Sequence, residues 1–226
     1  MTLRTSLLAF LSLLPVSLAA VEKAYEVADF KALHFSGVGE VHVVQSGRES
    51  LVVTGSEEAL EAVTVEVDHG VLYIEVDTRH RFRRAPQFEL EVKTIGEITA
   101  LGAGRVHAEG LVGRELFVAM HGSSRIVLER LAVHELNASS RGSGEFTVTG
   151  RVERQVVSLA GASRYTAEEL ASNYGEVSIR GAADARVAVA EVLDVMVSGA
   201  GSVEYIGSPR VYETVNGAGR IVSYGR

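Results

Sequence analysis

The sequence predicts an all-β protein of the parallel β-helix-like solenoid class, with about seven glycine-initiated coils. Two observations support this prediction: triplets of small residues recur at a nearly constant spacing, and the segments between them alternate as strands do. Successive triplets begin 20, 20, 19, 20, 18 and 18 residues apart, and a fixed period in this range is typical of stacked supersecondary units. The triplets are Gly102-Ala-Gly, Gly122-Ser-Ser, Gly142-Ser-Gly, Gly161-Ala-Ser, Gly181-Ala-Ala, Gly199-Ala-Gly and Gly217-Ala-Gly.

The residues after each triplet have the pattern of a β-strand. Two columns of mostly apolar residues stand four and six positions after the first glycine, so both are expected to face inward. A second alternating segment precedes the next glycine, as Val157 and Leu159 do before Gly161. The two columns are Val106, Ile126, Phe146, Tyr165, Ala185, Val203 and Ile221, and Ala108, Leu128, Val148, Ala167, Val187, Tyr205 and Ser223.

A solenoid explains the glycine column better than the alternative, which is a sandwich of antiparallel hairpins. A hairpin array has no reason to return the same residue type at the same corner in every unit. In a solenoid, equivalent corners stack about 4.8 Å apart, so each corner must be small. We expect a positive φ at the first glycine and a requirement for small volume at the two positions that follow.

Residues 20–100 are β-rich but less regular, and we expect them to form wider, decorated coils that continue into the repeats of residues 101–226. Ser56 precedes two acidic residues and is expected to cap a short helix. Asp68-His-Gly separates two alternating segments and predicts a hairpin turn. Gly37-Val-Gly-Glu-Val-His-Val matches the spacing of Gly102-Ala-Gly-Arg-Val-His-Ala and predicts an outlying copy of the motif. Residues 20–226 are therefore expected to be a single domain.

Residues 1–19 have the organisation of a cleaved secretory signal peptide. Arg4 supplies a positive charge, Leu7 to Leu14 form an apolar stretch, and Ser17-Leu-Ala provides small residues at the cleavage site. The alternative is an uncleaved anchor, which the short apolar stretch disfavours. The sequence therefore predicts a periplasmic, secreted or cell-surface protein.

Composition excludes several classes of protein. The net charge of −7 disfavours general nucleic-acid binding, because such proteins carry a basic surface. The absence of cysteine excludes disulfides, a thiol nucleophile and a lipid-bearing cysteine after the signal peptide.

The whole pattern resembles the bacterial family described as putative auto-transporter adhesin, head GIN domain. The resemblance covers roughly residues 25–226 and includes the glycine corners and two further segments. One is Val71-Leu-Tyr-Ile after Asp68-His-Gly, and the other is Val203-Glu-Tyr-Ile-Gly-Ser-Pro209 before Gly217-Ala-Gly. The resemblance implies a β-helix-like solenoid in exported bacterial proteins, with no set of catalytic residues to carry over.

The third residue after each repeated glycine forms a row of mostly charged side chains. Strand alternation places this row outward, where stacked neighbours would form an ion-pair ladder worth about 0.2–1 kcal/mol per pair. The functional alternative is a strip that docks an anionic sugar or lipid headgroup. The row is Arg105, Arg125, Glu145, Arg164, Asp184, Ser202 and Arg220.

A second basic cluster comprises Arg79, Arg81, Arg83 and Arg84 on an otherwise acidic chain. An exposed loop in contact with solvent would explain this cluster without any binding function. As a site, its guanidinium groups would contact the phosphate or carboxylate groups of an anionic glycan or lipid.

No motif predicts an enzyme, a metal site or a cofactor. The Gly-x-Gly elements lack the helix and third glycine of a dinucleotide site, and no Gly-x-Ser-x-Gly elbow is present. Parallel β-helices include polysaccharide lyases, but Asp184 is the one acid that we place near a basic column.

The sequence thus predicts an exported, non-catalytic binding or adhesion-type protein of the bacterial cell envelope. Its expected partners are a cell-surface glycan, an anionic lipid headgroup or a protein. The alternatives are a self-associating structural envelope protein and, less favoured, a polysaccharide-acting β-helix enzyme.

Overall fold

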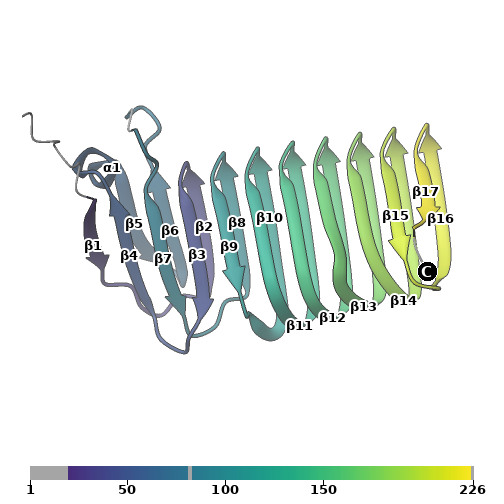
Figure 1. Cartoon of the computed structure of the whole chain (residues 1–226), viewed down its shortest axis with the longest axis horizontal. Helices are drawn as coiled ribbons and strands as arrows, with labels where there is room; N and C mark the ends of the chain where they lie inside the picture. Colours follow the sequence, from purple (N-terminus) through teal and green to yellow (C-terminus); the bar gives the residue numbers. More distant parts are fainter. Residues whose placement is uncertain (1–19, 81–82, 225–226) are drawn as a thin grey trace, which may run out of the picture.

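The predicted solenoid is present in the computed structural model, which describes residues 20–80 and 83–224 (Figure 1). Strands account for 73% of the residues. The segment predicted to be a signal peptide lies outside the described residues, as does Arg81. No helix in the described part of the chain has the length and hydropathy needed to cross a membrane.

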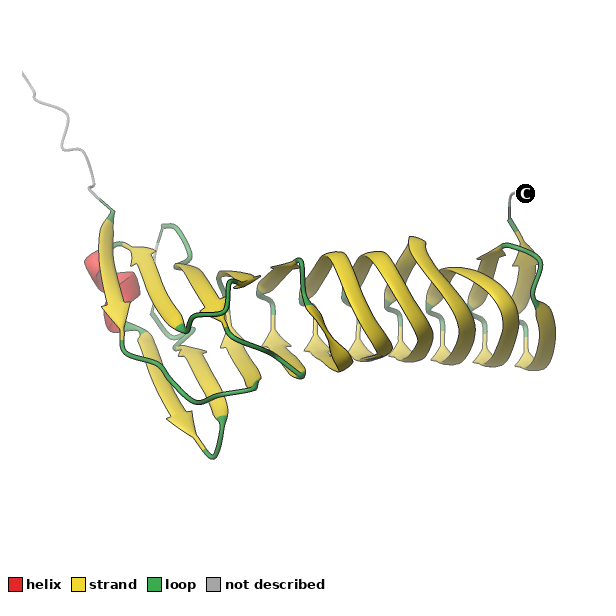
Figure 2. Cartoon of the chain, turned by 90° about the horizontal axis from the view of Figure 1, so that it is seen from below, coloured by secondary structure: helices red, strands yellow, loops and turns green. Residues whose placement is uncertain are grey.

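The regular part of the solenoid begins at β8 and continues to the last described strand. Every strand in it pairs in parallel with its equivalent on the next coil, so the coils stack along one axis (Figures 1 and 2). Its strands are β8 (Glu97–Gly102), β9 (Arg105–Glu109), β10 (Val112–Gly122), β11 (Arg125–Gly142), β12 (Glu145–Gly161), β13 (Arg164–Gly181), β14 (Asp184–Gly199), β15 (Ser202–Ile206), β16 (Arg210–Gly217) and β17 (Arg220–Ser223).

The repeated glycines form one column, as predicted. Gly102 is the register partner of Gly122, and the same pairing continues through every later repeat to Gly217. Seven glycines bound six intervals, and the solenoid has about six turns. The expected count of about seven coils was therefore slightly too high, because it assigned one coil to each glycine rather than to each interval.

Backbone geometry explains why these corners are glycine. All seven have positive φ values, and Gly142 has a φ of 147°. A Cβ atom on Gly142 would lie only 2.2 Å from the carbonyl oxygen of Gly122 on the preceding coil. The corner therefore demands glycine for its conformation and for close backbone approach.

The interior of the coils is filled by the predicted apolar columns as far as Val203; in the last described coil Ile221 is half-buried and Ser223 is exposed, because no further coil covers them in the described part of the chain. Val106, Ile126, Phe146 and Tyr165 are each fully buried in consecutive coils. Each such side chain contributes roughly 1.5–3 kcal/mol when it is removed from water. These side chains pack against those of the coils on both sides, and this packing, together with the continuous ladder of backbone hydrogen bonds, holds the stack together.

The irregular N-terminal part is β-rich, as predicted, and its strands do not stack in chain order. β2 lies between β6 and β8, and β3 lies between β7 and β9, all in parallel. The outlying motif copy is confirmed, because Gly37 pairs with Gly102 and has a φ of 114°. The strands are β2 (Ala32–Gly37), β3 (Glu40–Gln45), β6 (Val71–Val76) and β7 (Gln87–Val92).

Antiparallel elements cover this end of the solenoid. β4 (Ser50–Gly55) pairs with β7 and with β1 (Val21–Tyr25), whereas β5 (Val63–Asp68) pairs with β6. The hairpin predicted at Asp68-His-Gly joins β5 to β6. The predicted helix α1 (Glu57–Glu61) is also present, and Ser56 caps it by accepting a 3.3 Å hydrogen bond from the Ala59 amide.

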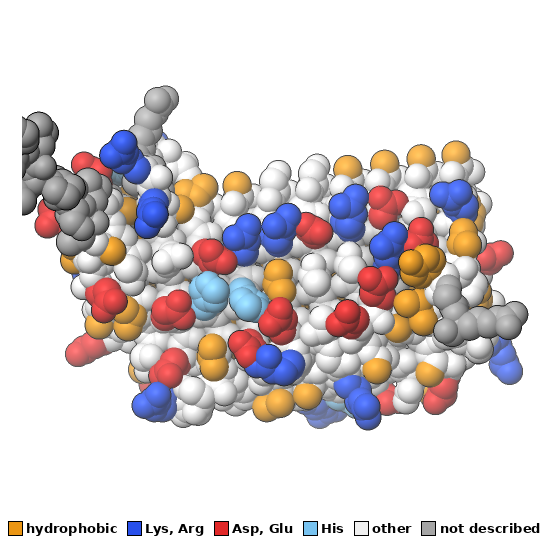
Figure 3. All heavy atoms as spheres, viewed as in Figure 1, with side chains coloured by type: hydrophobic (Ala, Val, Ile, Leu, Met, Phe, Trp, Pro, Cys, Tyr) orange, Lys and Arg blue, Asp and Glu red, His pale blue; other side chains and the backbone are white. Residues whose placement is uncertain are grey.

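The predicted charged row runs along one outer face, where basic and acidic side chains follow one another (Figure 3). Arg125 and Glu145 form an ion pair at 2.8 Å. The next two steps, Glu145 to Arg164 and Arg164 to Asp184, are register pairs without an ion pair among the described residues, and Asp184 instead accepts a 2.8 Å hydrogen bond from Ser202. The register of the ladder is as predicted, but its electrostatic pairing is discontinuous.

Candidate functional site

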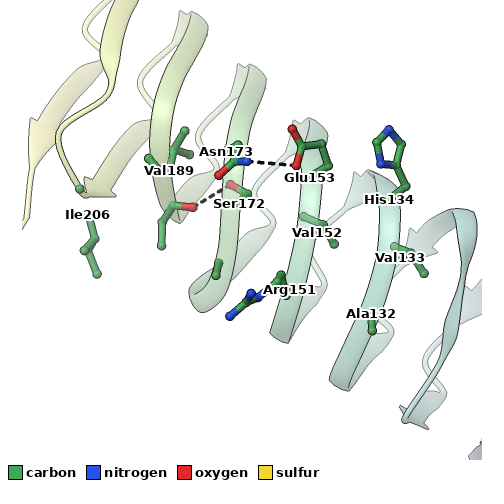
Figure 4. Close-up of a pocket in the computed structure, with 14 residues that line it drawn as sticks. Ala132, Val133, His134, Arg151, Val152, Glu153, Ser172, Asn173, Val189 and Ile206 are labelled. Carbon is green, nitrogen blue, oxygen red and sulfur yellow. Dashed lines mark hydrogen bonds between the residues drawn. The ribbon is translucent and has the colours of Figure 1, made fainter.

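A shallow hollow crosses the middle of β11, β12, β13 and β14 and ends at the turn after β15 (Figure 4). We call it the lateral groove, and its volume is about 650 Å³. It is lined by Ala132, Val133, His134, Arg151, Val152, Glu153, Ala171, Ser172, Asn173, Ala188, Val189, Ala190, Ile206 and Gly207.

Small side chains at stacked positions create the lateral groove. Ala132, Arg151, Ala171, Ala188 and Ile206 are successive register partners on five coils. Because three of these five are alanine, little side-chain volume rises above the strands along this row. The hollow therefore runs across the strands, parallel to the solenoid axis.

A change in coil length coincides with the groove. The coil from Gly161 to Gly181 has a step of 20 residues, whereas the next, from Gly181 to Gly199, has a step of 18. The register between β13 and β14 shifts between Ala167 and Ala171 and again between Ser172 and Tyr174, and the two shifts together absorb the difference. Such an irregularity takes backbone groups out of the ladder, and those groups need other partners.

Buried polar side chains supply those partners beneath the groove floor. Ser172 donates a 2.8 Å hydrogen bond to the Ala188 carbonyl, and Gln155, which is fully buried, donates to the Ser172 hydroxyl at 2.8 Å. Tyr165 in turn donates to the Gln155 side-chain oxygen at 3.2 Å. Burial raises the pKa of the Tyr165 phenol, so this group stays protonated and keeps its role as donor. The floor of the groove thus has an internally satisfied polar support.

The two edges of the groove carry its charged groups. Arg151 lies at the lower edge in Figure 4, and His134 and Glu153 lie at the upper edge. Asn173 donates a 3.0 Å hydrogen bond to Glu153. Arg151 is exposed and has no ion pair or side-chain hydrogen bond with any described residue. The arrangement offers an apolar floor with one uncommitted cation beside it.

Of the predicted anion-binding cluster, the structure describes Arg79, Arg83 and Arg84, and their surroundings differ. Arg79 is engaged by Asp77, to which its guanidinium donates hydrogen bonds of 2.7 and 2.9 Å, and this contact holds the pKa of Asp77 well below its usual value. Arg83 and Arg84 are exposed and line a second hollow of about 680 Å³, together with Glu58 and Gln87. Two of the four positions therefore share a surface that an anion can reach.

Two histidines at the same position of the matching glycine motifs, His42 and His107, lie side by side. His42 and His107 are register partners on β3 and β9, and their ring centroids lie 5.4 Å apart. His107 Nε2 lies 3.3 Å from a Glu129 carboxylate oxygen. Within residues 20–80 and 83–224, no group of three or more His, Cys, Asp or Glu side chains is placed to hold a metal ion.

Comparison with known proteins identifies the family. The family model described as putative auto-transporter adhesin, head GIN domain, matches residues 29–209. The chain belongs to this family. The resemblance predicted from the glycine corners is thereby confirmed, and a search among curated proteins gave no match.

Solved structures of other bacterial proteins share the fold. A putative adhesin from Bacteroides fragilis is 25% identical, with a TM-score of 0.86 over 92% of this chain and 98% of its own. A putative lipid binding protein from Parabacteroides distasonis is 20% identical, with a TM-score of 0.74 over 91% and 96% of the two chains. A putative adhesin from Parabacteroides merdae is 21% identical, with a TM-score of 0.69 over 91% and 96%.

Sequence reasoning did not locate the lateral groove of this GIN domain. The available signal was the irregular spacing of the glycines, which drops from 20 to 18 residues at Gly181. A second signal was the polar Gln155 in a column that also holds Leu116, Leu136, Gly175 and Leu193. Both mark the coils at which the regular ladder is interrupted.

Proposed function

We propose that this chain is an exported, non-catalytic binding protein of the adhesion type in the bacterial cell envelope, and that the lateral groove is its contact surface. The chain belongs to a family whose description names an adhesin, and this membership supports a role in binding. The signal-peptide pattern of residues 1–19 supports export. The partner would be a cell-surface glycan, an anionic lipid headgroup or a protein.

The observation that carries the proposal is the open, elongated groove on a rigid stack. Loops give many binding proteins their sites, but here the groove is formed by strands whose backbone groups are fixed by ladders on both sides. A preorganised surface loses little conformational entropy when a partner binds. A long, shallow contact of this kind suits an extended surface component better than a small, fully enclosed substrate.

A pair of tryptophan variants tests the contact surface. Ala171 is exposed inside the groove, and Ser178 faces outward on another part of the same strand, β13. Labelled wild type, Ala171→Trp and Ser178→Trp would be compared for binding to cell-envelope fractions and to a glycan array. We expect Ala171→Trp alone to lose binding. Equal binding by all three proteins would contradict the proposal.

Export has its own test. The full chain would be expressed in a bacterial host, and the periplasmic and culture fractions would be analysed by intact mass. We expect a mature protein that begins at Ala20, after removal of residues 1–19. Full-length protein retained in the cytoplasm would refute export while leaving the binding proposal open to its separate test.

We further propose Arg83 and Arg84, with Arg79 and Arg81, as an accessory anion contact. Arg83 and Arg84 are the members that line the second hollow. Replacing these two with serine should abolish any salt-sensitive binding to anionic glycans or lipids, because exposed charges act over distances that salt screens. Unchanged salt dependence would remove this contact from the proposal.

Self-association is a second candidate, and the last described coil favours it. β16 and β17 each pair with an earlier coil, and Tyr212, Val215 and Val222 are exposed there. Unpaired strand edges can template association. Light scattering over a range of concentrations distinguishes the two roles: growing assemblies would favour self-association, and a persistent monomer would favour the binding role.

A further inference from the structure

We infer that the lateral groove binds a single-chain anionic amphiphile, such as a long-chain fatty acid, with its aliphatic chain along the axis and its carboxylate at Arg151. This inference rests on the proposed function and specifies the class of ligand. It is argued from the length of the groove, the chemistry of its floor and the charges at its edges.

The groove has the length and direction of an extended aliphatic chain. Arg151 stands on the second of the five coils in the outer row, and three steps of about 4.8 Å, or roughly 14 Å, separate it from Ile206. An extended hydrocarbon with C–C bonds of about 1.5 Å advances roughly 1.3 Å per carbon, so about eleven carbons would span this distance, and a longer chain would extend past Ile206. Between Arg151 and Ile206 the row holds Ala171 and Ala188, so it runs parallel to the axis without a large side chain in between.

The floor offers apolar contact and little hydrogen bonding. Val133, Val152 and Val189 lie beneath the row, and the backbone groups of parallel strands pair with neighbouring coils rather than pointing outward. The Ser172 hydroxyl is already occupied by Ala188 and Gln155. A sugar placed here would lose hydrogen bonds of its hydroxyl groups without replacement. The lining residues include no Phe, Tyr or Trp to form a platform for a sugar ring, and the His134 ring lies at the upper edge of the groove.

The charged side chains at the two edges of the groove favour an anionic head group. Arg151 is the uncommitted cation, and a guanidinium can hold a carboxylate through two parallel hydrogen bonds. Glu153, on the opposite edge, would repel an anion, but Asn173 donates a hydrogen bond to it and it lies across the floor from Arg151 (Figure 4). The head group is therefore expected at the Arg151 edge, with the chain extending over Ala171 and Ala188.

Binding of hexadecanoate below its micellar concentration, measured by calorimetry, tests the inference. Up to about twelve carbons, the length between Arg151 and Ile206, affinity should rise by roughly twofold with each added methylene, since a half-open groove covers one side of a group whose full burial gives about fourfold. Arg151→Gln should weaken hexadecanoate binding by about fivefold and leave hexadecanol unchanged, because an exposed ion pair has this magnitude. Arg180→Gln removes an exposed arginine outside the groove and serves as the matched control.

Ala171→Trp should reduce hexadecanoate binding more than tenfold, with circular dichroism confirming that the variant is folded. Failure of wild type to bind hexadecanoate, or equal binding by Ala171→Trp, would overturn the inference. So would binding of phosphatidylglycerol vesicles that Ala171→Trp retains, because that result places the lipid contact elsewhere. If wild type does not bind hexadecanoate but its binding to envelope fractions still depends on Ala171, the ligand class is wrong and the proposed contact surface stands. If envelope binding is independent of Ala171, the contact surface itself fails.

Discussion

Replacing Gly142 with alanine should destabilise the solenoid through the backbone. Gly142 occupies the middle of the glycine column with a φ of 147°. Its added Cβ would lie 2.2 Å from the Gly122 carbonyl oxygen and 2.9 Å from the Gly122 nitrogen. Real Cβ atoms do not approach backbone this closely, so either the two coils must separate or the corner must change its conformation.

The magnitude follows from two contributions. Holding a non-glycine residue in this region of φ costs about 1–3 kcal/mol. Moving the coils apart also weakens the 2.9 Å hydrogen bond from the Ser143 amide to the Gly122 carbonyl, which is worth about 1 kcal/mol. We therefore expect a loss of roughly 2–4 kcal/mol in the free energy of unfolding.

Two other glycines separate these contributions. Gly110 has a φ of 67° with nothing within 4 Å of an added Cβ, so Gly110→Ala isolates conformational strain and should cost about 1 kcal/mol. Gly113 also has open space and no positive φ, so Gly113→Ala should be neutral or slightly stabilising. We therefore expect Gly113→Ala to be the most stable of the three variants, Gly110→Ala to be intermediate and Gly142→Ala to be the least stable.

Urea unfolding followed by circular dichroism measures the order, and amide hydrogen exchange at Ser143 reports the local effect. A repeat protein can open locally, so both measurements are needed. If the stability of Gly142→Ala lies within about 0.5 kcal/mol of Gly113→Ala, close backbone packing does not explain the glycine column.

Three further outcomes are expected. Glu145→Arg removes the partner of Arg125 and creates a run of like charges in the row. The Tm should therefore fall by a few degrees at low salt and recover at high salt. An unchanged Tm at low salt would show that the charged row contributes nothing to stability. Gln155→Leu should reduce the free energy of unfolding in urea by about 1–3 kcal/mol, because it leaves buried polar groups without partners; a stability equal to wild type would show that the polar network is dispensable. The lowered pKa of Asp77 means that its contact with Arg79 stabilises the fold fully above the unfolded pKa of about 3.9, and that this contribution is lost as the pH falls through the folded value. NMR titration should find the Asp77 pKa below 3.8 in wild type and raised towards it in Arg79→Ser; identical values in both proteins would contradict the pairing.

The regular coils were predictable because their constraints are local and repeated. A glycine every 18–20 residues, followed by alternating apolar residues, leaves few other arrangements. The N-terminal strand order was not predictable in the same way. β2 and β3 carry the same motif as later coils, yet they are inserted between strands that follow them in the chain. That order is decided by which faces pack together, and periodicity does not encode it.

The candidate site was less predictable than the fold. The arginine cluster was visible as charge, but no sequence pattern indicated that Asp77 engages Arg79 while Arg83 and Arg84 remain exposed. The lateral groove depends on the register between β13 and β14, which places Ala188 beside Ala171 in one row. Such a row becomes visible only when the exact register of each coil is known.

Because the coils are joined end to end by a single covalent path, the stack has a mechanical property of its own. Tension applied along the axis acts on one ladder boundary at a time, and each boundary that yields frees 18–20 residues of slack. At about 3.3–3.6 Å per residue, that is roughly 60–70 Å of extension per step. An attachment built on this scaffold would lengthen in equal increments under load, and it would dissipate force before the bound surface is released.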